Sequence, residues 1–214
     1  MGIEVPMLAD MAASVPPGLR ERKKLDTRMA LSDAALVLMF ERGLENVVRE
    51  DIAAQAGVSV RTFTNYFANK YEALAYRQIE RMRRTVEMLR ARPAGEPLWE
   101  AVTAAVLAPL VDDGVNRRPP TREQLAEAAK LTAVPEVYAA FTREVTGDLA
   151  AAVAARTGTD AERDLYPRLV AGAVVVAYQA AIEVYVRAEP PVFLTVPLRE
   201  AFTRIAAGLP DPSA

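Results

Sequence analysis

Hydrophobic residues recur along this chain at the three- and four-residue spacing of amphipathic helices. The clearest example lies in residues 27–42, where one apolar face comprises Leu31, Ala34, Ala35, Leu38 and Met39. Gly43 follows directly and is expected to end that helix. The sequence has no long alternation of apolar and polar positions and no Asn-Gly or Asp-Gly hairpin turn. The pattern therefore predicts an all-helical protein.

Capping residues and helix-breaking residues divide the chain into nine expected helices. The residues with N-cap or capping-box chemistry are Ser59, Asn69, Thr121 with Gln124, and Thr159 with Glu162. The expected helices cover residues 27–42, 49–56, 59–67, 70–90, 98–111, 122–133, 136–156, 161–188 and 198–208. Pro109 and Pro167 fall inside two of these ranges, so we expect them to kink or shorten those helices.

The segment Arg49–Leu74, REDIAAQAGVSVRTFTNYFANKYEAL, places two short helices on either side of Gly57. Two helices joined by a short turn that contains glycine form a helix-turn-helix. Phe63 and Phe67 are expected to pack inward, which leaves a polar outer face comprising Arg61, Thr62, Asn65 and Tyr66. Arg and Asn can read guanine and adenine in the major groove, whereas Thr and Tyr hydroxyls reach phosphates. Lys70 begins the next helix, where its charge and free N–H groups favour a phosphate.

Charge is divided unevenly between the two parts of the chain. Residues 1–92 carry 15 Lys and Arg against 12 Asp and Glu, whereas residues 93–214 carry 11 against 16, and the net charge is −2. This division favours a basic module that binds a polyanion, joined to an acidic module that does not. A short amphipathic helix with a polar outer face is also common in any helical bundle, so spacing alone allows a purely structural role.

The composition excludes several classes of function. The chain has no Cys and no His, so it has no disulfide, no thiolate or imidazole metal ligand, and no Ser-His or Cys-His catalytic pair. We expect no catalytic residue, no metal site and no cofactor, with Asp112 and Asp113 forming a solvated loop pair rather than a cation site. The N-terminus lacks the pattern of an export signal, and the apolar run at residues 169–182 is shorter than the about 18 residues that span a bilayer. These features predict a cytoplasmic protein without a membrane partner.

The segment Thr27–Leu74 resembles the N-terminal DNA-binding domain of the TetR family of bacterial transcriptional regulators, and the nine-helix pattern agrees with that family. The resemblance implies a three-helix helix-turn-helix domain at residues 26–70 and a larger ligand-binding and dimerisation domain at residues 71–214. Residues 1–25 precede them as an expected mobile tail with a basic end. The family implies a homodimer on the nucleoid that binds a palindromic operator in double-stranded DNA. It is usually a repressor that releases DNA when a small molecule enters the C-terminal domain.

Motif position carries the family's DNA contacts onto particular residues. The resemblance assigns phosphate or base contacts to Thr62, Tyr66 and Lys70, and sequence preference to Arg61 and Asn65. Val48 stands where members often have a Thr that caps the helix. The absence of that cap is expected to lower the stability of the protein by roughly 1 kcal/mol. The neighbouring Arg49 is expected to replace the phosphate contact by its charge. Thr64 stands where members often have an aromatic residue.

The C-terminal part offers candidate dimerisation and ligand residues. Residues 161–188 are apolar around nearly the whole helix, so they must be covered on several sides. With residues 198–208 they are expected to pair with a second copy, unless they form the central core of a monomer. The candidate interface residues are Ala173, Ala177, Phe202 and Ile205. The candidate residues for an apolar ligand pocket are Met82, Val86, Trp99, Val102, Tyr138, Phe141 and Tyr178, with Arg143 or Glu183 as a polar anchor.

Two alternatives remain open on these observations. One is a DNA-binding regulator whose C-terminal domain serves dimerisation or a protein partner and takes no small molecule. The other is an all-helical small-molecule- or acyl-binding protein that contains a helix pair of similar appearance. Binding to duplex DNA that weakens steeply with salt distinguishes the regulator from the carrier protein.

Overall fold

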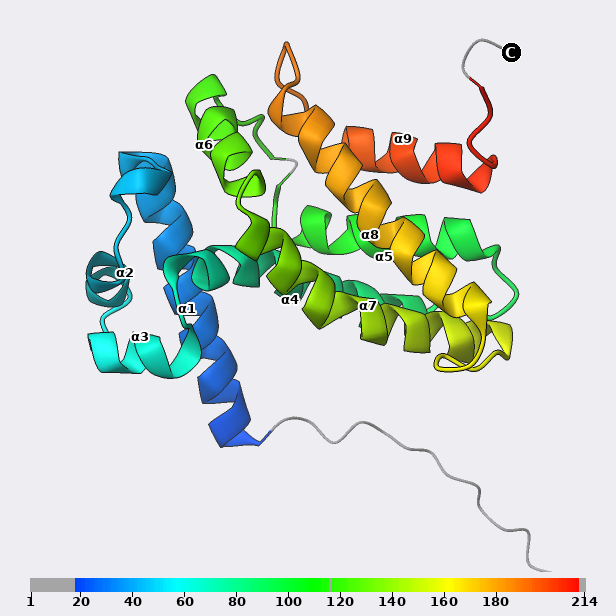
Figure 1. Ribbon diagram of the computed structural model, residues 1–214, viewed down its shortest axis with the longest axis horizontal. Helices are drawn as coiled ribbons and strands as arrows, with labels where there is room; N and C mark the ends of the chain where they lie inside the picture. Colours follow the sequence, from blue (N-terminus) through cyan, green and yellow to red (C-terminus); the bar gives the residue numbers. More distant parts are fainter. Residues whose placement is uncertain (1–17, 116, 212–214) are drawn as a thin grey trace, which may run out of the picture.

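The computed structural model describes residues 18–115 and 117–211, and all regular structure within these ranges is helical. The helices are α1 (Leu19–Arg42), the 3-10 turn η1 (Leu44–Asn46), α2 (Arg49–Gln55), α3 (Val60–Tyr66), α4 (Lys70–Ala91), α5 (Leu98–Asp112), α6 (Arg122–Thr132), α7 (Pro135–Thr157), α8 (Leu165–Val186) and α9 (Thr195–Ala206). Figure 1 shows α1, α2 and α3 grouped at one end and α4 to α9 beside them. The predicted all-helical fold with about nine helices is confirmed.

The helices α1, α2 and α3 close around a small hydrophobic core, here called the N-terminal core. Phe63 is fully buried, its ring centroid lies 5.9 Å from that of Phe67, and Phe67 meets Tyr76 of α4 at 5.5 Å. The other large members of this core are Leu31, Leu38, Met39, Leu44, Ile52 and Leu74. Each aromatic or branched side chain that is fully buried stabilises the folded protein by about 1.5–3 kcal/mol. Several such side chains together make a short three-helix unit rigid. The expected inward packing of Phe63 and Phe67 is confirmed.

Local signals set the ends of these helices. Ser59 Oγ accepts a 3.0 Å hydrogen bond from the Thr62 N–H, and Asn69 Oδ1 accepts one of 3.0 Å from the Glu72 N–H. Gly57 adopts φ +68°, a conformation that side-chain-bearing residues rarely reach, so the turn between α2 and α3 needs its glycine. The capping box predicted at Thr121 is also present in the structure.

The second unit, α4 to α9, surrounds a larger hydrophobic core, here called the C-terminal core. α4 belongs to both units, since Ala73 and Tyr76 face the N-terminal core whereas Ile79, Met82 and Val86 face the C-terminal core. Figure 1 shows α8 crossing the bundle between α7 and α9. A single continuous helix therefore connects the end of the helix-turn-helix with the centre of the larger unit.

The first helix starts earlier than the sequence pattern predicted. α1 begins at Leu19 rather than near Thr27, so the assignment of residues 19–25 to a tail is wrong. These residues, LRERKKL, are mostly strong helix formers, and Lys24 adds an i,i+3 ion pair to Glu21 at 2.9 Å. The remainder of the expected tail, residues 1–17, lies outside the described residues.

The start of α8 also differs from the prediction, because of Pro167. A proline inside a helix clashes with the carbonyl four residues earlier, so the helix begins at Leu165, where Pro167 falls in the first turn. The expected capping box at Thr159 does not form; Asp160 Oδ1 instead accepts hydrogen bonds from the Glu162 and Arg163 N–H groups at 2.8 and 3.1 Å. α9 likewise begins at Thr195, three residues early, with its proline in the first turn.

Among the described residues, one helix, α8, is long and apolar enough to span a membrane. With 22 residues, α8 is longer than the apolar run at residues 169–182 that the sequence analysis considered too short to span a bilayer. Core helices of globular proteins pass the same test, and in this fold α8 packs between α7 and α9. Eight of its residues are buried there, so the expectation of a core helix holds for one side of α8 only.

Candidate nucleic-acid interface and ligand cavity

The outer face of α3 carries the polar residues that the sequence singled out. Arg61 and Asn65 lie one helical turn apart and are both exposed. Within the described residues, neither the guanidinium of Arg61 nor the side-chain amide of Asn65 has a hydrogen-bond partner, so both are available to base edges. Thr64 is exposed on the same helix, where its hydroxyl donates to the Arg61 carbonyl at 3.0 Å, so the missing aromatic leaves no gap in the core.

Thr62, Tyr66 and Lys70 are less free than expected. The Thr62 hydroxyl shares a 2.9 Å hydrogen bond with Ser59, and the Arg28 guanidinium lies 5.9 Å from the centre of the Tyr66 ring. Lys70 Nζ donates to the Leu44 carbonyl at 2.9 Å. An ammonium group has three protons, so this bond leaves Lys70 further donors for a phosphate.

The start of α2 shows the cost of Val48. This residue occupies the N-cap and makes no side-chain hydrogen bond there, as its chemistry predicted. Arg49 is more than half exposed, and its Nε donates to Glu50 Oε1 at 2.8 Å. That hydrogen bond lowers the pKa of the Glu50 carboxyl, and it also neutralises part of the charge that Arg49 was expected to offer a phosphate.

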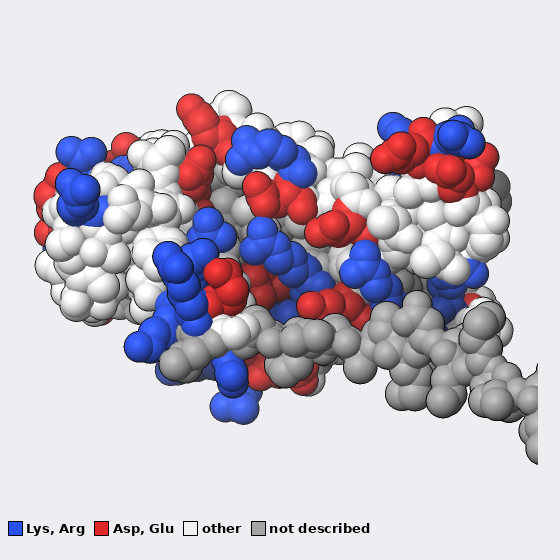
Figure 2. Space-filling view, turned by 90° about the horizontal axis from the view of Figure 1, so that it is seen from below, with Lys and Arg blue, Asp and Glu red and all other residues white. Residues whose placement is uncertain are grey.

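Basic side chains gather where the described chain begins. Figure 2 views this face from below and shows Lys and Arg side chains around the start of α1. The first turns of α1 contain Arg20, Arg22, Lys23 and Lys24, all exposed. The positive charge expected of a flexible tail is therefore carried, at least from residue 20, by a helix.

A cavity of about 330 Å³ lies where the two units meet. Its walls come from α1, α4, α6, α7 and α8, with Val115 and Leu194 from connecting segments. Three of the residues expected to line a pocket, Tyr138, Phe141 and Tyr178, do so. The rings of Phe141 and Tyr178 are stacked, with centroids 5.7 Å apart and planes inclined by 29°. A ligand here would touch the helix-turn-helix unit directly through Leu36, Met39 and Phe40.

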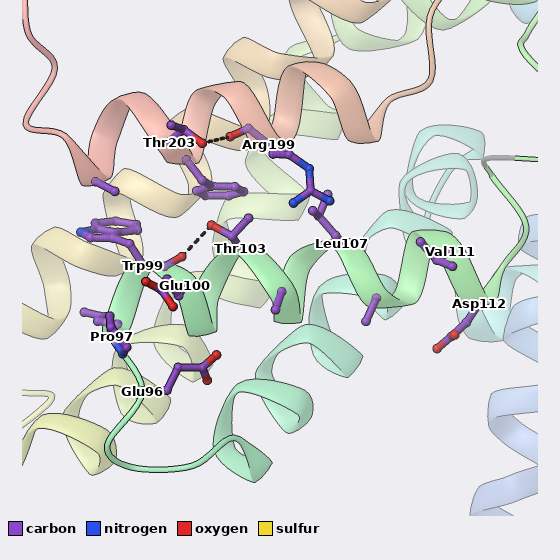
Figure 3. Close-up of a pocket in the computed structure, with 15 residues that line it drawn as sticks. Glu96, Pro97, Trp99, Glu100, Thr103, Leu107, Val111, Asp112, Arg199 and Thr203 are labelled. Atoms are coloured by element: carbon purple, nitrogen blue, oxygen red, sulfur yellow. Dashed lines mark hydrogen bonds between the residues drawn. The ribbon is translucent and has the colours of Figure 1, made fainter.

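The remaining expected pocket residues lie elsewhere. Met82, Val86 and Val102 are buried in the C-terminal core and do not border the cavity, because α5 and α7 cover that stretch of α4. Trp99 borders a separate groove of about 950 Å³ between α5 and α9. Figure 3 shows Arg199 of α9 reaching toward α5 across this groove. The hydroxyls of Thr103 and Thr203 bond to carbonyls of their own helices at 2.6 and 2.8 Å, so they offer little to a ligand.

The cavity contains polar groups that sequence reasoning missed. Gln78, Arg77 and Arg81 of α4 line it, together with Tyr178. Tyr178 is 3% exposed, and burial raises the pKa of its phenol to about 12, so it is a neutral donor at ordinary pH. Within the described residues, neither Tyr178 Oη nor Gln78 Nε2 has a hydrogen-bond partner. Spacing along α4 could have placed Gln78 near the pocket, but only the fold shows that its Nε2 is buried.

Asp113 is held by arginines, so the expected solvated pair is wrong for this residue. Its carboxylate accepts hydrogen bonds from Arg81 Nε and Arg84 Nη2, each at 2.8 Å, and it lies 3.7 Å from Arg77 Nε. Burial alone would raise the pKa of Asp113, but the bonds from Arg81 and Arg84 bring it below its ordinary value. Asp113 therefore ties the end of α5 to α4 beside the cavity.

The other polar candidates do not face the cavity. Arg143 is exposed next to Glu144, and Glu183 is exposed on α8. In the described ranges, no group of three or more acidic residues is placed to hold a metal ion.

The outer side of α8 carries apolar side chains that nothing in the protomer covers. The exposed members are Leu165, Tyr166, Leu169, Val176 and Val184, here called the α8 stripe. The assignment of Ala177 and Phe202 to the interface is wrong. These residues are 3% and 0% exposed and pack inside the protomer. Ala173 and Ile205 are half-buried at the margin.

Comparison with known proteins matches both units. Residues 31–75 match the model of bacterial regulatory proteins of the tetR family, and residues 96–210 match the model of the MftR C-terminal domain. The chain is 35% identical over 160 residues to the HTH-type transcriptional regulator TcmR of Streptomyces glaucescens, which covers 72% of this chain and 70% of that protein.

Solved structures share the fold at low sequence identity. Thermus thermophilus FadR, a TetR-family transcriptional repressor in complex with lauroyl-CoA, aligns with TM-score 0.56 at 18% identity, covering 87% of this chain and 97% of that one. SmeT, the repressor of the Stenotrophomonas maltophilia multidrug efflux pump SmeDEF, aligns with TM-score 0.53 at 18% identity, covering 88% and 96%. A complex of SmeT with triclosan aligns at 0.50, with 18% identity and coverage of 87% and 98%.

Proposed function

This chain belongs to the TetR family of bacterial regulatory proteins, and we propose that it is a homodimeric repressor that releases a palindromic operator when a small, largely apolar molecule enters the cavity beside Tyr178. The single observation that carries this proposal is the composition of the cavity wall. Side chains of α1, in the DNA-binding unit, and of α7 and α8, in the larger unit, meet around the same space.

The DNA-binding half of the proposal rests on α3. Arg61 and Asn65 would read base edges, because both are exposed and unpaired within the described chain. Thr62, Tyr66 and Lys70 would contact phosphates at the margin of the same face, and Arg49 would add a charge from the start of α2. The basic first turns of α1 lie at the end of this unit and would extend the contact along the backbone.

The ligand half rests on the cavity. Relatives of this fold have been solved with lauroyl-CoA and with triclosan, both of which carry large apolar portions. A cavity of about 330 Å³ lies near the lower end of the usual range for small-molecule sites, about 300–1,000 Å³. We therefore assign a compact ligand rather than a long chain, with Tyr138, Phe141 and Tyr178 as its apolar walls.

Coupling between the two sites would run through α4 and η1. Lys70 Nζ holds the carbonyl of Leu44, and α4 continues from Lys70 to the cavity residues Gln78 and Arg81. A ligand that displaced α4 would therefore move the start of this helix and the turn before α2. An altered distance between two recognition helices no longer fits half-sites about one DNA turn apart, and the coupling required is about 1–3 kcal/mol.

A second copy would cover the α8 stripe. Exposed Val176 and Val184 lie on one side of α8, and family members act as dimers. We propose that two α8 helices and two α9 helices form the interface, with Ala173 and Ile205 at its margin. Family members are generally non-enzymatic, so we assign no reaction to the chain, and we place it in the cytoplasm on the nucleoid.

The test is selection of bound DNA from a random duplex library with purified full-length protein at near-physiological salt. Enrichment of an inverted repeat supports a dimeric, sequence-specific regulator. Failure of folded protein, stripped of co-purified small molecules, to enrich any sequence would overturn the DNA-binding role and leave a carrier of small molecules as the remaining interpretation.

A further inference from the structure

We propose that the cavity selects an aromatic acid, with its ring system against Phe141 and Tyr178 and its carboxylate accepting hydrogen bonds from Tyr178 Oη and Gln78 Nε2. The inference rests on the proposed function in that it names the ligand class for the same cavity. It adds the chemistry of the polar end, which neither the fold nor the relatives specify.

The first observation is a pair of buried donors without an acceptor. Tyr178 and Gln78 both line the cavity, and within the described residues neither Tyr178 Oη nor Gln78 Nε2 has a hydrogen-bond partner. The two side chains are close enough that Gln78 offsets part of the effect of burial on the pKa of Tyr178. A buried donor that bonds to nothing costs about 1–3 kcal/mol, so two of them at one site favour a ligand atom that accepts. Because burial holds the pKa of Tyr178 near 12, its hydroxyl keeps its proton for that bond.

The second observation is the sign of the charge at this wall. The ionisable side chains that line the cavity are Arg77, Arg81, Tyr138, Tyr178 and Tyr185, and the lining includes no Asp or Glu. Asp113 neutralises part of the charge of Arg77, Arg81 and Arg84, and Asp33 pairs with Arg77 at 2.8 Å. The charged groups that border the cavity are therefore the guanidinium groups of Arg77 and Arg81, while their carboxylate partners lie outside its lining, so the wall favours a carboxylate over an ammonium group.

The third observation is the shape of the apolar part. Phe141 and Tyr178 present stacked rings, and Phe40, Tyr138, Ile182 and Tyr185 complete the wall. Aromatic rings add about 0.5–1.5 kcal/mol per pair when they stack or meet edge to face, beyond the area that they bury. A space of about 330 Å³ suits two or three fused rings.

The experiment uses two fluorescent probes of equal size and opposite charge, anthracene-2-carboxylate and anthracen-2-ylmethylammonium, titrated into full-length protein without DNA at pH 7.5. We expect the carboxylate to bind with a Kd at least tenfold lower than that of the ammonium probe. Tyr178→Phe should raise the carboxylate Kd at least tenfold and leave the ammonium Kd unchanged. Tyr71→Phe is the matched control, since Tyr71 lies on α4 like Gln78 but does not line the cavity, and it should leave both values unchanged.

Thermal unfolding keeps the result interpretable. Tyr178→Phe removes an unpartnered hydroxyl, so its Tm should equal or exceed that of the parent, and Gln78→Met provides a second variant with the same expected loss of carboxylate binding. The ligand class is overturned if the ammonium probe binds as tightly, if neither probe binds to folded protein, or if both variants bind the carboxylate as the parent does. None of these results would change the outcome of the DNA selection. If that selection failed while the carboxylate probe still bound as expected, the proposed role in DNA binding would be rejected and the proposed ligand class would stand.

Discussion

The backbone N–H of Leu44 donates a 2.7 Å hydrogen bond to Glu127 Oε2, joining the turn before α2 to a helix 83 residues further along the chain. The carbonyl of the same residue accepts from Lys70 Nζ at 2.9 Å. Bonds from Lys130 and from the Leu44 N–H lower the pKa of Glu127, so it stays ionised at neutral pH. The backbone of one residue beside the helix-turn-helix, Leu44, is thus held from α6 through its N–H and from α4 through its carbonyl.

Glu127→Ala should release the backbone N–H of Leu44. A hydrogen bond to a charged group is worth about 1.5–3 kcal/mol, so exchange of the Leu44 amide hydrogen should accelerate about 10- to 100-fold. Hydrogen exchange followed by NMR or mass spectrometry over residues 43–47 provides the measurement. Glu123→Ala, an exposed glutamate one turn earlier on α6, should leave that rate unchanged. Equal protection of Leu44 in Glu127→Ala and the parent would show that α6 does not hold the turn.

Arg61→Ala should relax base preference at one position of each half-site. Loss of a bidentate contact to guanine costs about 1–3 kcal/mol of discrimination, whereas Lys70→Ala should weaken all sequences alike and reduce the salt slope by about one unit. Competition binding with single-base variants of the selected operator measures both effects. Arg90→Ala removes an exposed arginine from the last turn of α4, outside α3 and the proposed dimer interface, and serves as the control. Unchanged preference in Arg61→Ala would remove α3 from base recognition.

Val176→Arg should produce monomers. Val176 is 61% exposed in the protomer, so the change costs little in folding, but two charges on facing α8 helices would repel each other. Light scattering at micromolar concentration gives the mass. Val111→Arg, at a position that is 55% exposed on α5, should remain dimeric. A dimer of Val176→Arg as stable as the parent would place the interface elsewhere.

Val48→Thr should stabilise the protein by about 1 kcal/mol. Position 48 already has the extended backbone of an N-cap, φ −123° and ψ 155°, and lacks only an oxygen that can accept from the first turn of α2. Urea unfolding of Val48→Thr beside Val48→Ala separates the cap from the loss of the valine side chain. If both variants unfold at the same urea concentration, the hydroxyl does not cap α2.

Asp113→Asn should destabilise the protein in a pH-dependent way. The pKa of Asp113 is lower in the folded chain than in the unfolded chain, so its contribution is fully present above the unfolded value of about 3.9 and is lost as the pH falls through the lower folded value. Urea unfolding should show a difference of about 2 kcal/mol at pH 7 that shrinks below about pH 4. Asp112→Asn, at the exposed neighbouring position, should show no such difference. A gap between parent and Asp113→Asn that persists unchanged below pH 4 would contradict the ion pairing.

The parts of the fold that follow from local chemistry were predictable from the sequence. The N-caps at Ser59 and Asn69 and the positive φ of Gly57 depend on neighbouring residues, and all three are present. The expected capping box at Thr159 failed although its spacing was correct, because Pro167 decided where α8 could begin. Local pattern therefore located each helix, whereas helix-forming residues 19–25 moved the start of α1 and prolines moved the starts of α8 and α9.

The polar side of the cavity was not predictable, since it forms only when distant segments meet. Asp113 is 29 residues from Arg84 and 32 from Arg81, and nothing in a loop sequence of two aspartates indicates that α4 will lie beside it. Gln78 sits among charged residues on a helix that looks amphipathic, and only the packing of α7 and α8 buries its amide. Aromatic residues such as Phe141 and Tyr178 could be proposed from composition alone, but their stacking could not.

α8 presents Tyr178 to the cavity and Val176 to the opposite side, two residues away on the same rigid helix. In the dimer proposed above, a substitution that enlarges the space around Tyr178 would also change how α8 packs against the second copy. In the evolution of related repressors, a change of inducer would then tend to alter which chains can dimerise. After a gene duplication, the same few mutations would change both the ligand that each copy binds and the chain with which it dimerises. Newly diverged regulators would then stop forming mixed dimers as their ligands change.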